Sequence, residues 1–345
     1  MNAERPIRVL VVDDSAFARK VLRETLAARP GLQVVGVARD GLEALEKIAE
    51  LQPDVVTLDL VMPNLDGVGV LRSLRALSAA GGPRVVIVSI SDSDSALGIE
   101  ALQLGAFDLV QKPTALATDR LYELSGELIA KVIAAATSPH RVVAPAPATI
   151  ALPRTKNAVR LIVIGTSTGG PQALTRVLTA LPGDLPCALA VALHIPAGYT
   201  EALAHRLDEA CALHVFEAAE GATLSPGSVA IARGGMNLRV RAEGRTITTH
   251  LDATPTSSPF CPSVDVLFES AAAALGPATL AVVMTGMGND GLAGARAIAQ
   301  GRGRTLTESE ASCVVYGMPR AVVEAKLSDG EALLEDLPQL ILASL

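Results

Sequence analysis

Short apolar runs alternate with helix-like segments along most of the chain, and this alternation limits the possible folds more than any other feature. In the first part of the chain the runs are RVLVV (8–12), LQVVGVA (32–38), DVVTLDL (54–60), RVVIVSI (84–90) and FDLVQ (107–111). Runs that are apolar along their whole length are typical of parallel strands, which helices cover on both faces. The alternation therefore predicts a doubly wound α/β fold with right-handed crossovers.

The segment between the first two runs shows the helical pattern. It reads SAFARKVLRETLAAR, and its apolar residues share one helical face: Phe17, Val21, Leu22 and Leu26. Ser15 stands where the N-cap of this helix is expected. We therefore predict an amphipathic helix in this segment.

The same alternation returns after a segment rich in proline and alanine. Residues 134–157 have little amphipathic periodicity and are predicted to form a semi-extended linker. Beyond them the apolar runs are VRLIVIG (159–165), CALAVALH (187–194), GSVAIA (227–232), TITTH (246–250) and ATLAVVMTG (278–286). Because 345 residues exceed one ordinary core, we expect two doubly wound parallel-sheet domains, 1–133 and 158–345.

The composition excludes some classes of function. A net charge of −7 and a pI near 5.3 argue against a nucleic-acid-binding protein, which usually carries a basic face. No apolar run approaches the roughly 18–20 residues that a membrane span needs. The N-terminal sequence MNAERPIRVLVV lacks the long apolar region of a signal peptide. We expect a cytoplasmic protein without direct membrane insertion.

Polar side chains mark the ends of the apolar runs in the first domain. The run 8–12 is followed by Asp13 and Asp14, the run 54–60 contains Asp59, and the last two runs lead to Ser89 and Lys112. Ligands of parallel sheets usually sit beyond the carboxyl ends of the strands. Three carboxylates that converge there favour Mg²⁺, beside which a hydroxyl and an ammonium group can hold a phosphoryl group.

These residues resemble the receiver domain of bacterial response regulators, which has a flavodoxin-like fold. The matching stretches are VLVVDDSAFARKVL, TLDLVMPNLDGVGVL, VVIVS and FDLVQKP. The resemblance implies that Asp59 is the phosphoacceptor and a metal ligand and that Asp13 and Asp14 are further ligands of Mg²⁺. It also implies that Ser89 is the switch hydroxyl and that Lys112 contacts the phosphoryl group.

A glycine-rich stretch, LIVIGTSTGGPQAL, begins the second domain and admits three interpretations. It could cradle a phosphate, present a nucleophilic serine, or only connect a strand to a helix. No lysine follows Gly170, so the phosphate loop G-x-x-x-x-G-K-[ST] is absent, and G-x-G-x-x-G is absent too. The stretch does match G-x-S-x-G, which exposes Ser167 on a sharp strand-to-helix turn.

A nucleophilic serine needs a base and a group that orients the base. Among five histidines, only His194 ends a long apolar run and opens a Pro-Gly loop. Asp290 lies in a third strand-end loop, MTGMGNDG, where it could orient an imidazole or cap the next helix. Ser167, His194 and Asp290 would then form a catalytic triad at one sheet edge.

The second domain is similar to the catalytic domain of the chemotaxis protein-glutamate methylesterase family, a Rossmann-like three-layer fold. The stretches that carry the similarity are IGTSTGGPQAL, HIPAGYT, PSVDVLFES, TGMGNDGLAGA and EASCVVYGMPRAV. The resemblance implies Ser167 as nucleophile, His194 as general base and then acid, and Asp290 as its partner. The backbone N–H groups near Thr168 and Met287 are candidates for the oxyanion hole.

The resemblance also implies a reaction, partners and regulation. The reaction is hydrolysis of glutamate 5-methyl esters on methyl-accepting chemoreceptors, with release of methanol and deamidation of receptor glutamines. A chemotaxis histidine kinase would phosphorylate Asp59 and so activate the enzyme. Mg²⁺ serves the receiver, and ester hydrolysis needs no cofactor. Two alternatives stay open: a phosphorylation-switched docking protein without catalysis, and the same esterase in a non-flagellar chemosensory pathway.

Overall fold

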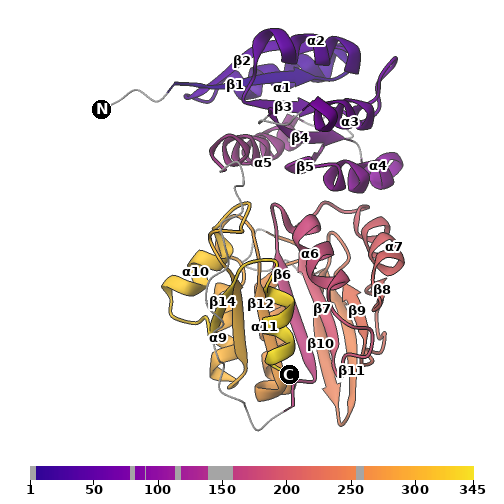
Figure 1. Ribbon diagram of the computed structural model, residues 1–345, viewed down its shortest axis with the longest axis vertical. Coiled ribbons are helices and arrows are strands. Elements are labelled where there is room, and N and C mark those ends of the chain that lie inside the picture. Colours follow the sequence, from indigo (N-terminus) through magenta and orange to yellow (C-terminus); the bar gives the residue numbers. More distant parts are fainter. Residues whose placement is uncertain (1–4, 78–81, 90, 113–117, 139–157, 254–259) are drawn as a thin grey trace. The chain divides into compact units, whose positions relative to one another are not determined.

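The computed structural model describes the chain outside residues 1–4, 78–81, 90, 113–117, 139–157 and 254–259 (Figure 1). It divides into two compact units, Met1–His140 and Arg141–Leu345. In the part of the chain that the structure describes, no helix is long and apolar enough to cross a membrane.

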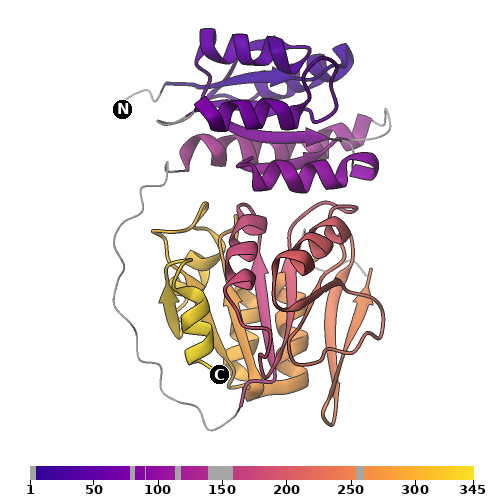
Figure 2. The ribbon, with the colours of Figure 1, turned by 45° about the vertical axis from the view of Figure 1, so that its right-hand side comes forward.

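The N-terminal unit is a parallel five-stranded sheet with helices on both faces (Figures 1 and 2). Its strand order is β2-β1-β3-β4-β5, which confirms the doubly wound fold. Its elements are β1 (Ile7–Val12), α1 (Ala16–Ala27), β2 (Leu32–Ala38), α2 (Gly41–Leu51), β3 (Val55–Leu58), α3 (Gly67–Leu77), β4 (Arg84–Ser89), α4 (Ser91–Gln103), β5 (Asp108–Gln111) and α5 (Thr118–Thr137).

Helix α1 follows the predicted pattern except at its first turn. Ser15 caps the helix, because its hydroxyl accepts from the Ala18 N–H, and Leu22 and Leu26 are buried. The periodicity places Phe17 on the same apolar face, but Phe17 is 54% exposed. The helix therefore packs against the core through its later turns. Periodicity alone does not predict that its first turn is exposed to solvent.

Helix α5 runs further than the sequence suggested. It ends at Thr137, so residues 134–137 continue the helix and do not belong to the linker that the sequence predicts. The rest of the expected linker, 139–157, lies outside the described residues.

The C-terminal unit contains one long parallel sheet and a separate hairpin. Its elements up to the hairpin are β6 (Leu161–Thr166), α6 (Gly170–Thr179), β7 (Ala188–Leu193), α7 (Thr200–Ala210), β8 (His214–Glu217), β9 (Ser228–Ile231), β10 (Asn237–Glu243) and β11 (Thr246–Asp252). After it come α8 (Val264–Leu275), a 3₁₀ turn (Gly276–Ala278), β12 (Thr279–Val283), α9 (Leu292–Gln300), β13 (Arg304–Glu308), α10 (Met318–Glu324), β14 (Gly330–Ala332) and α11 (Leu337–Ala343).

The order of the parallel sheet, β14-β13-β12-β6-β7-β9-β8, places β6 inside it. From β6 the chain first builds the β7 side and only later returns to β12 on the other side. The order therefore reverses beside β6, and such switch points are where open α/β sheets bind their ligands.

The run 246–250 belongs to the hairpin and not to the parallel sheet, contrary to our expectation. Strand β11 pairs antiparallel with β10, and α8 packs against this hairpin. Its residues alternate between exposed and buried positions near the start, whereas β6 and β7 are buried throughout. Alternation is typical of an antiparallel strand with one solvent-exposed face, and the sequence TITTH already indicates such a strand.

Candidate active site and phosphoryl site

Three neighbouring strands bring the predicted triad residues to one sheet edge. Thr166 of β6 lies opposite Leu193 of β7, so the next residues along these strands are Ser167 and His194. The His194 N–H donates to the Thr166 carbonyl at 3.1 Å. On its other side β6 pairs with β12, which leads into the loop that carries Asp290.

Ser167 lies in the tight turn between β6 and α6 and is 8% exposed. Its N–H donates to the Thr285 carbonyl at 3.0 Å. Gly169 adopts a left-handed conformation, with φ of 77°, where the chain turns into α6. A Cβ at Gly286 would lie 2.8 Å from the Ser167 Cβ. The loops after β6 and β12 thus approach too closely for a larger side chain, and this contact fixes the serine.

Thr285 joins these loops through several hydrogen bonds. Its hydroxyl donates to the Thr168 carbonyl at 2.9 Å and accepts from the Val315 N–H at 3.0 Å. Its own N–H donates to the carboxylate of Glu308, which is fully buried at the end of β13, at 2.8 Å. Sequence reasoning missed both residues, because neither belongs to a recognisable catalytic motif.

Asp290 is 4% exposed and accepts four hydrogen bonds. His194 Nε2 and the Val264 N–H contact Oδ2 at 2.7 and 2.8 Å. The Ser263 hydroxyl and the Asp265 N–H both contact Oδ1 at 3.0 Å. Burial disfavours the charge of Asp290, but the His194 contact and the backbone donors outweigh it and lower the pKa of this carboxyl.

The contact with Asp290 determines which ring nitrogen of His194 can act as a base. A carboxylate accepts hydrogen bonds, so the proton of the neutral ring belongs on Nε2. The lone pair then lies on Nδ1, which is buried and has no hydrogen-bond partner among the described residues. The ring also stacks on Phe260, with centroids 4.1 Å apart and planes 11° apart. The Asp290 contact and this stacking hold the ring in one orientation.

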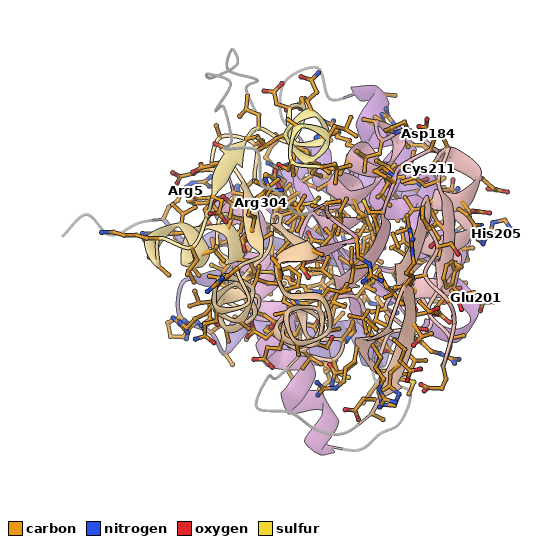
Figure 3. All side chains as sticks on the ribbon, turned by 90° about the horizontal axis from the view of Figure 1, so that it is seen from below. Arg5, Asp184, Glu201, His205, Cys211 and Arg304 are labelled. Atoms are coloured by element: carbon orange, nitrogen blue, oxygen red, sulfur yellow. The ribbon has the colours of Figure 1, made fainter. Side chains whose placement is uncertain are left out.

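The other three histidines that the structure describes do not take part in this arrangement. His205 and His214 have side chains that are 75% and 72% exposed, and Figure 3 shows His205 at the margin of the molecule. His250 in β11 contacts Glu220 at 2.8 Å. His140 lies outside the described residues. Of the histidines that the structure describes, His194 is the one paired with Asp290.

The oxyanion-hole assignment stays a prediction. Thr168 is buried directly after Ser167, and its carbonyl accepts from Thr285. Met287 is half-buried and follows Gly286 in the loop after β12. Both residues therefore lie in the loops that surround Ser167, where a donor to the substrate carbonyl is needed.

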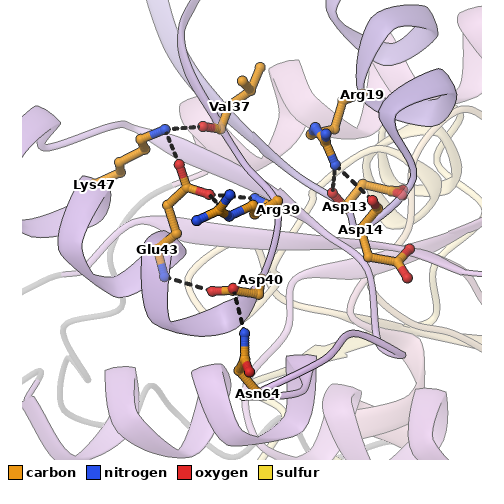
Figure 4. A network of polar contacts seen from close by, with 9 residues as sticks. All are labelled: Asp13, Asp14, Arg19, Val37, Arg39, Asp40, Glu43, Lys47 and Asn64. Atoms are coloured by element: carbon orange, nitrogen blue, oxygen red, sulfur yellow. Dashed lines mark hydrogen bonds and ion pairs between the residues drawn. The ribbon is translucent and has the colours of Figure 1, made fainter.

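The acidic cluster of the N-terminal unit forms as predicted at the carboxyl ends of β1 and β3. One carboxylate oxygen from each of Asp13, Asp14 and Asp59 lies within 4.8 Å of the others. Lys112 Nζ lies 2.7 Å from Asp13 Oδ2 and 2.6 Å from Asp59 Oδ2. The Arg19 side chain donates to the Asp13 and Asp14 carbonyls and holds the loop after β1 (Figure 4).

Electrostatics of this cluster fit a bound divalent cation. Burial raises the pKa of Asp59, and Lys112 opposes this effect without cancelling it. Burial also works against the charge of Lys112, but Asp59 and Asp13 outweigh it and raise the pKa of Lys112. Because Lys112 alone does not offset the burial of Asp59, and carboxylate oxygens of Asp13 and Asp14 lie close by, the oxygen cluster is suited to a hard cation such as Mg²⁺. Ser89, fully buried at the end of β4, accepts from the Lys112 N–H through its carbonyl at 2.8 Å.

A neighbouring network holds the loop between β2 and α2 of the same unit (Figure 4). Asp40 caps α2 by accepting from the Glu43 N–H at 2.9 Å, and it also accepts from the Asn64 side chain at 2.8 Å. These two bonds lower the pKa of Asp40. Lys47 contacts Glu43 at 2.6 Å within the helix.

The site also contains residues that the sequence did not reveal as functional. Ser263 caps α8 and, with the following backbone, holds Asp290, while Phe260 covers His194. A serine before an apolar helical stretch predicts a cap. Nothing local predicts that an aspartate from another loop binds the same helix end.

Together these features define a class of protein: a response regulator whose output unit is built as a serine hydrolase. The CheB methylesterase family model matches residues 162–341, and the model of the response regulator receiver domain matches residues 9–123. The chain belongs to the CheB methylesterase family.

Individual relatives agree with this assignment over the whole chain. A protein of Myxococcus xanthus named protein-glutamate methylesterase/protein-glutamine glutaminase 5 is 59% identical, with 99% of each chain covered. A protein-glutamate methylesterase/protein-glutamine glutaminase of Halalkalibacterium halodurans is 43% identical over 96% of each chain. The crystal structure of the Thermotoga maritima CheB methylesterase catalytic domain matches with a TM-score of 0.52 and 35% identity, covering 54% of this chain and 98% of that one.

Proposed function

We propose that this protein hydrolyses glutamate 5-methyl esters on methyl-accepting chemoreceptors, releases methanol, and deamidates receptor glutamines at the same site. The observation that carries the proposal is the buried pair of His194 and Asp290 on the strand end next to Ser167. The names of the relatives, which combine both activities, support it.

The geometry supports a two-step acyl transfer. Ser167 Oγ attacks the side-chain carbonyl carbon while its proton passes to Nδ1 of His194. The bond to the methoxy oxygen breaks, Nδ1 returns the proton, and methanol leaves a glutamyl ester on Ser167. Water then attacks this ester with His194 again as the base, which frees Ser167 and the glutamate carboxylate. A glutamine amide follows the same steps with ammonia as the leaving group.

Asp290 and the oxyanion hole lower the barrier for these steps. Asp290 holds the imidazole on Nε2 and stabilises the positive charge that the ring acquires. The N–H groups of Thr168 and Met287 are the proposed donors to the oxyanion, and one such donor typically contributes about 10²–10³-fold in rate.

The direct test is methanol release from methylated receptor membranes. We expect Ser167→Ala to abolish the release while receptor binding is kept. Thr179→Ala serves as the control, because this threonine lies exposed at the far end of α6. Unchanged release by Ser167→Ala would contradict the assignment. A natural protein that binds the receptors without releasing methanol would favour the non-catalytic alternative.

Regulation by phosphorylation of Asp59 is part of the proposal. Asp13, Asp14 and Asp59 would hold Mg²⁺, which when bound neutralises phosphoryl oxygens, and Lys112 would contact the phosphoryl group. A chemotaxis histidine kinase is the proposed phosphodonor, and the cytoplasm is the proposed location of this protein. We expect a small-molecule phosphodonor to raise methanol release by the natural protein and not by Asp59→Asn. Glu50→Gln, an exposed carboxylate of α2, is the control, and stimulation of Asp59→Asn would refute the phosphoacceptor assignment.

A further inference from the structure

We propose that Asp265, in the first turn of α8, is a positioning residue that holds Asp290 in place and adds negative charge behind His194. The inference rests on the catalytic roles proposed above for Asp290 and His194.

The N-terminus of each of the helices α8 and α9 donates hydrogen bonds to a carboxylate that lies at the start of the other helix. Asp290, just before α9, accepts from the N–H groups of Val264 and Asp265 at 2.8 and 3.0 Å and so binds the start of α8. Asp265 Oδ1, in turn, accepts from the N–H groups of Gly291 and Gly294 at 2.8 and 2.7 Å. Each helix end therefore holds an acidic side chain from the other segment, which its dipole favours.

Helix α9 depends on this exchange because its own N-cap is Gly291, which has no side chain to cap it. Gly291 directly follows Asp290, so the hydrogen bond from the Gly291 N–H to Asp265 holds the peptide next to the catalytic carboxylate. A Cβ at Gly294 would lie 2.5 Å from the Phe268 Cβ and 3.2 Å from the Asp265 Cα. The two helices are thus too close at this point for a side chain at Gly294.

The charge of Asp265 adds to that of Asp290. Burial raises the pKa of Asp265 to about 6, and the neighbouring Asp290 contributes to the same shift. Above that value both carboxylates carry charge. The titratable groups that act on Asp290 include His194, which directly follows β7, and Asp265 from α8. A second carboxylate charge beside Asp290 adds to the stabilisation of the positive charge that the ring acquires when Ser167 reacts.

Two substitutions separate the positional role from the electrostatic role. Asp265→Asn keeps an oxygen that can accept from Gly291 and Gly294 but removes the charge. Asp265→Ala removes both the acceptor and the charge. Glu269→Gln is the matched control, because it removes an exposed carboxylate one turn later on α8.

The experiment measures kcat and KM for methanol release by the full chain with phosphodonor, between about pH 5 and 9. We expect Asp265→Asn to move the acidic limb of the rate profile to lower pH by about 0.5–1 unit. We expect Asp265→Ala to lower kcat by about 10–100-fold with KM unchanged, because Asp290 shifts. Glu269→Gln should match the natural protein in both respects.

The outcomes that overturn the proposal are defined separately for the two variants. An unmoved profile for Asp265→Asn refutes the charge effect, and that variant decides this point even where the alanine variant does not fold. An unchanged kcat for a folded Asp265→Ala refutes the positional role. Activity that survives Ser167→Ala would instead show that the proposed function is wrong, whatever the Asp265 variants do.

Discussion

Thr285→Val removes one hydroxyl from the contact between the loops after β6 and β12 while it keeps the shape of the side chain. Thr285 is fully buried, and its hydroxyl donates to the Thr168 carbonyl and accepts from the Val315 N–H. The valine methyl group can make neither bond. The substitution therefore tests whether these two bonds hold the loop that carries Ser167.

The size of the effect follows from the burial of the two partners. A buried polar group that loses its partner costs about 1–3 kcal/mol. Thr168 is 2% exposed and incurs this cost, whereas Val315 is only half-buried and can recover part of it from water. We expect a loss of about 2–4 kcal/mol in unfolding free energy. For a unit of this size that loss lowers the unfolding temperature by about 5–15 °C.

The measurements are calorimetry of the full chain and methanol release by the same samples. Thr285→Ser is the control, because it keeps the hydroxyl and loses one methyl group, worth about 1 kcal/mol. We expect kcat to fall at least about tenfold in the valine variant, since the nucleophile loop shifts. If the serine variant loses as much stability as the valine variant, the two hydrogen bonds are not what holds this loop.

Three further predictions concern the same edge of the sheet. Asp290→Asn should lower kcat by about 10⁴-fold in the methanol assay, because an amide no longer fixes the proton of His194 on Nε2; a small loss would contradict the triad. Gly286→Ala should lower kcat while the fold, followed by circular dichroism, persists, since the added methyl displaces Ser167; full activity would show that the close contact has no effect. The raised pKa of Asp265 means that the charged form of this side chain is disfavoured in the folded state. The unfolding free energy of the natural protein should therefore fall, relative to that of Asp265→Asn, as pH rises from about 4 to about 6. Urea unfolding at several pH values checks this, and a natural protein that gains stability relative to Asp265→Asn as pH rises over this range would contradict the prediction.

The sequence predicted the parts of the site that each strand delivers by itself. An apolar run followed by a glycine-rich loop located Ser167, and the ends of other runs located His194 and Asp59. Because parallel strands all present their carboxyl ends at one edge, residues that follow different strands could be expected to meet there. The pairing of His194 with Asp290 agrees with that expectation.

What the sequence could not predict depends on contacts between distant segments. The first turn of α8 reads as an ordinary capped helix, yet it holds Asp290 through Val264 and Asp265. Thr285 reads as the end of a strand, and only the packing of two loops makes its hydroxyl important. Neither propensity nor periodicity describes how one helix end meets another.

The strand order of the C-terminal unit has a consequence for the protein during its synthesis. Strand β6 is the first strand of the C-terminal unit to be synthesised. The Thr166 hydroxyl at its end donates a hydrogen bond to the carbonyl of Thr285, which lies 119 residues later in the chain. Likewise His194 can form its contact with Asp290 only after a further 96 residues have been synthesised. Pairings across such long separations close late and slow the folding of a domain. A ribosome must therefore release almost the whole polypeptide before any molecule can become an esterase, and a nascent chain cut short before β12 carries Ser167 and His194 without a working site.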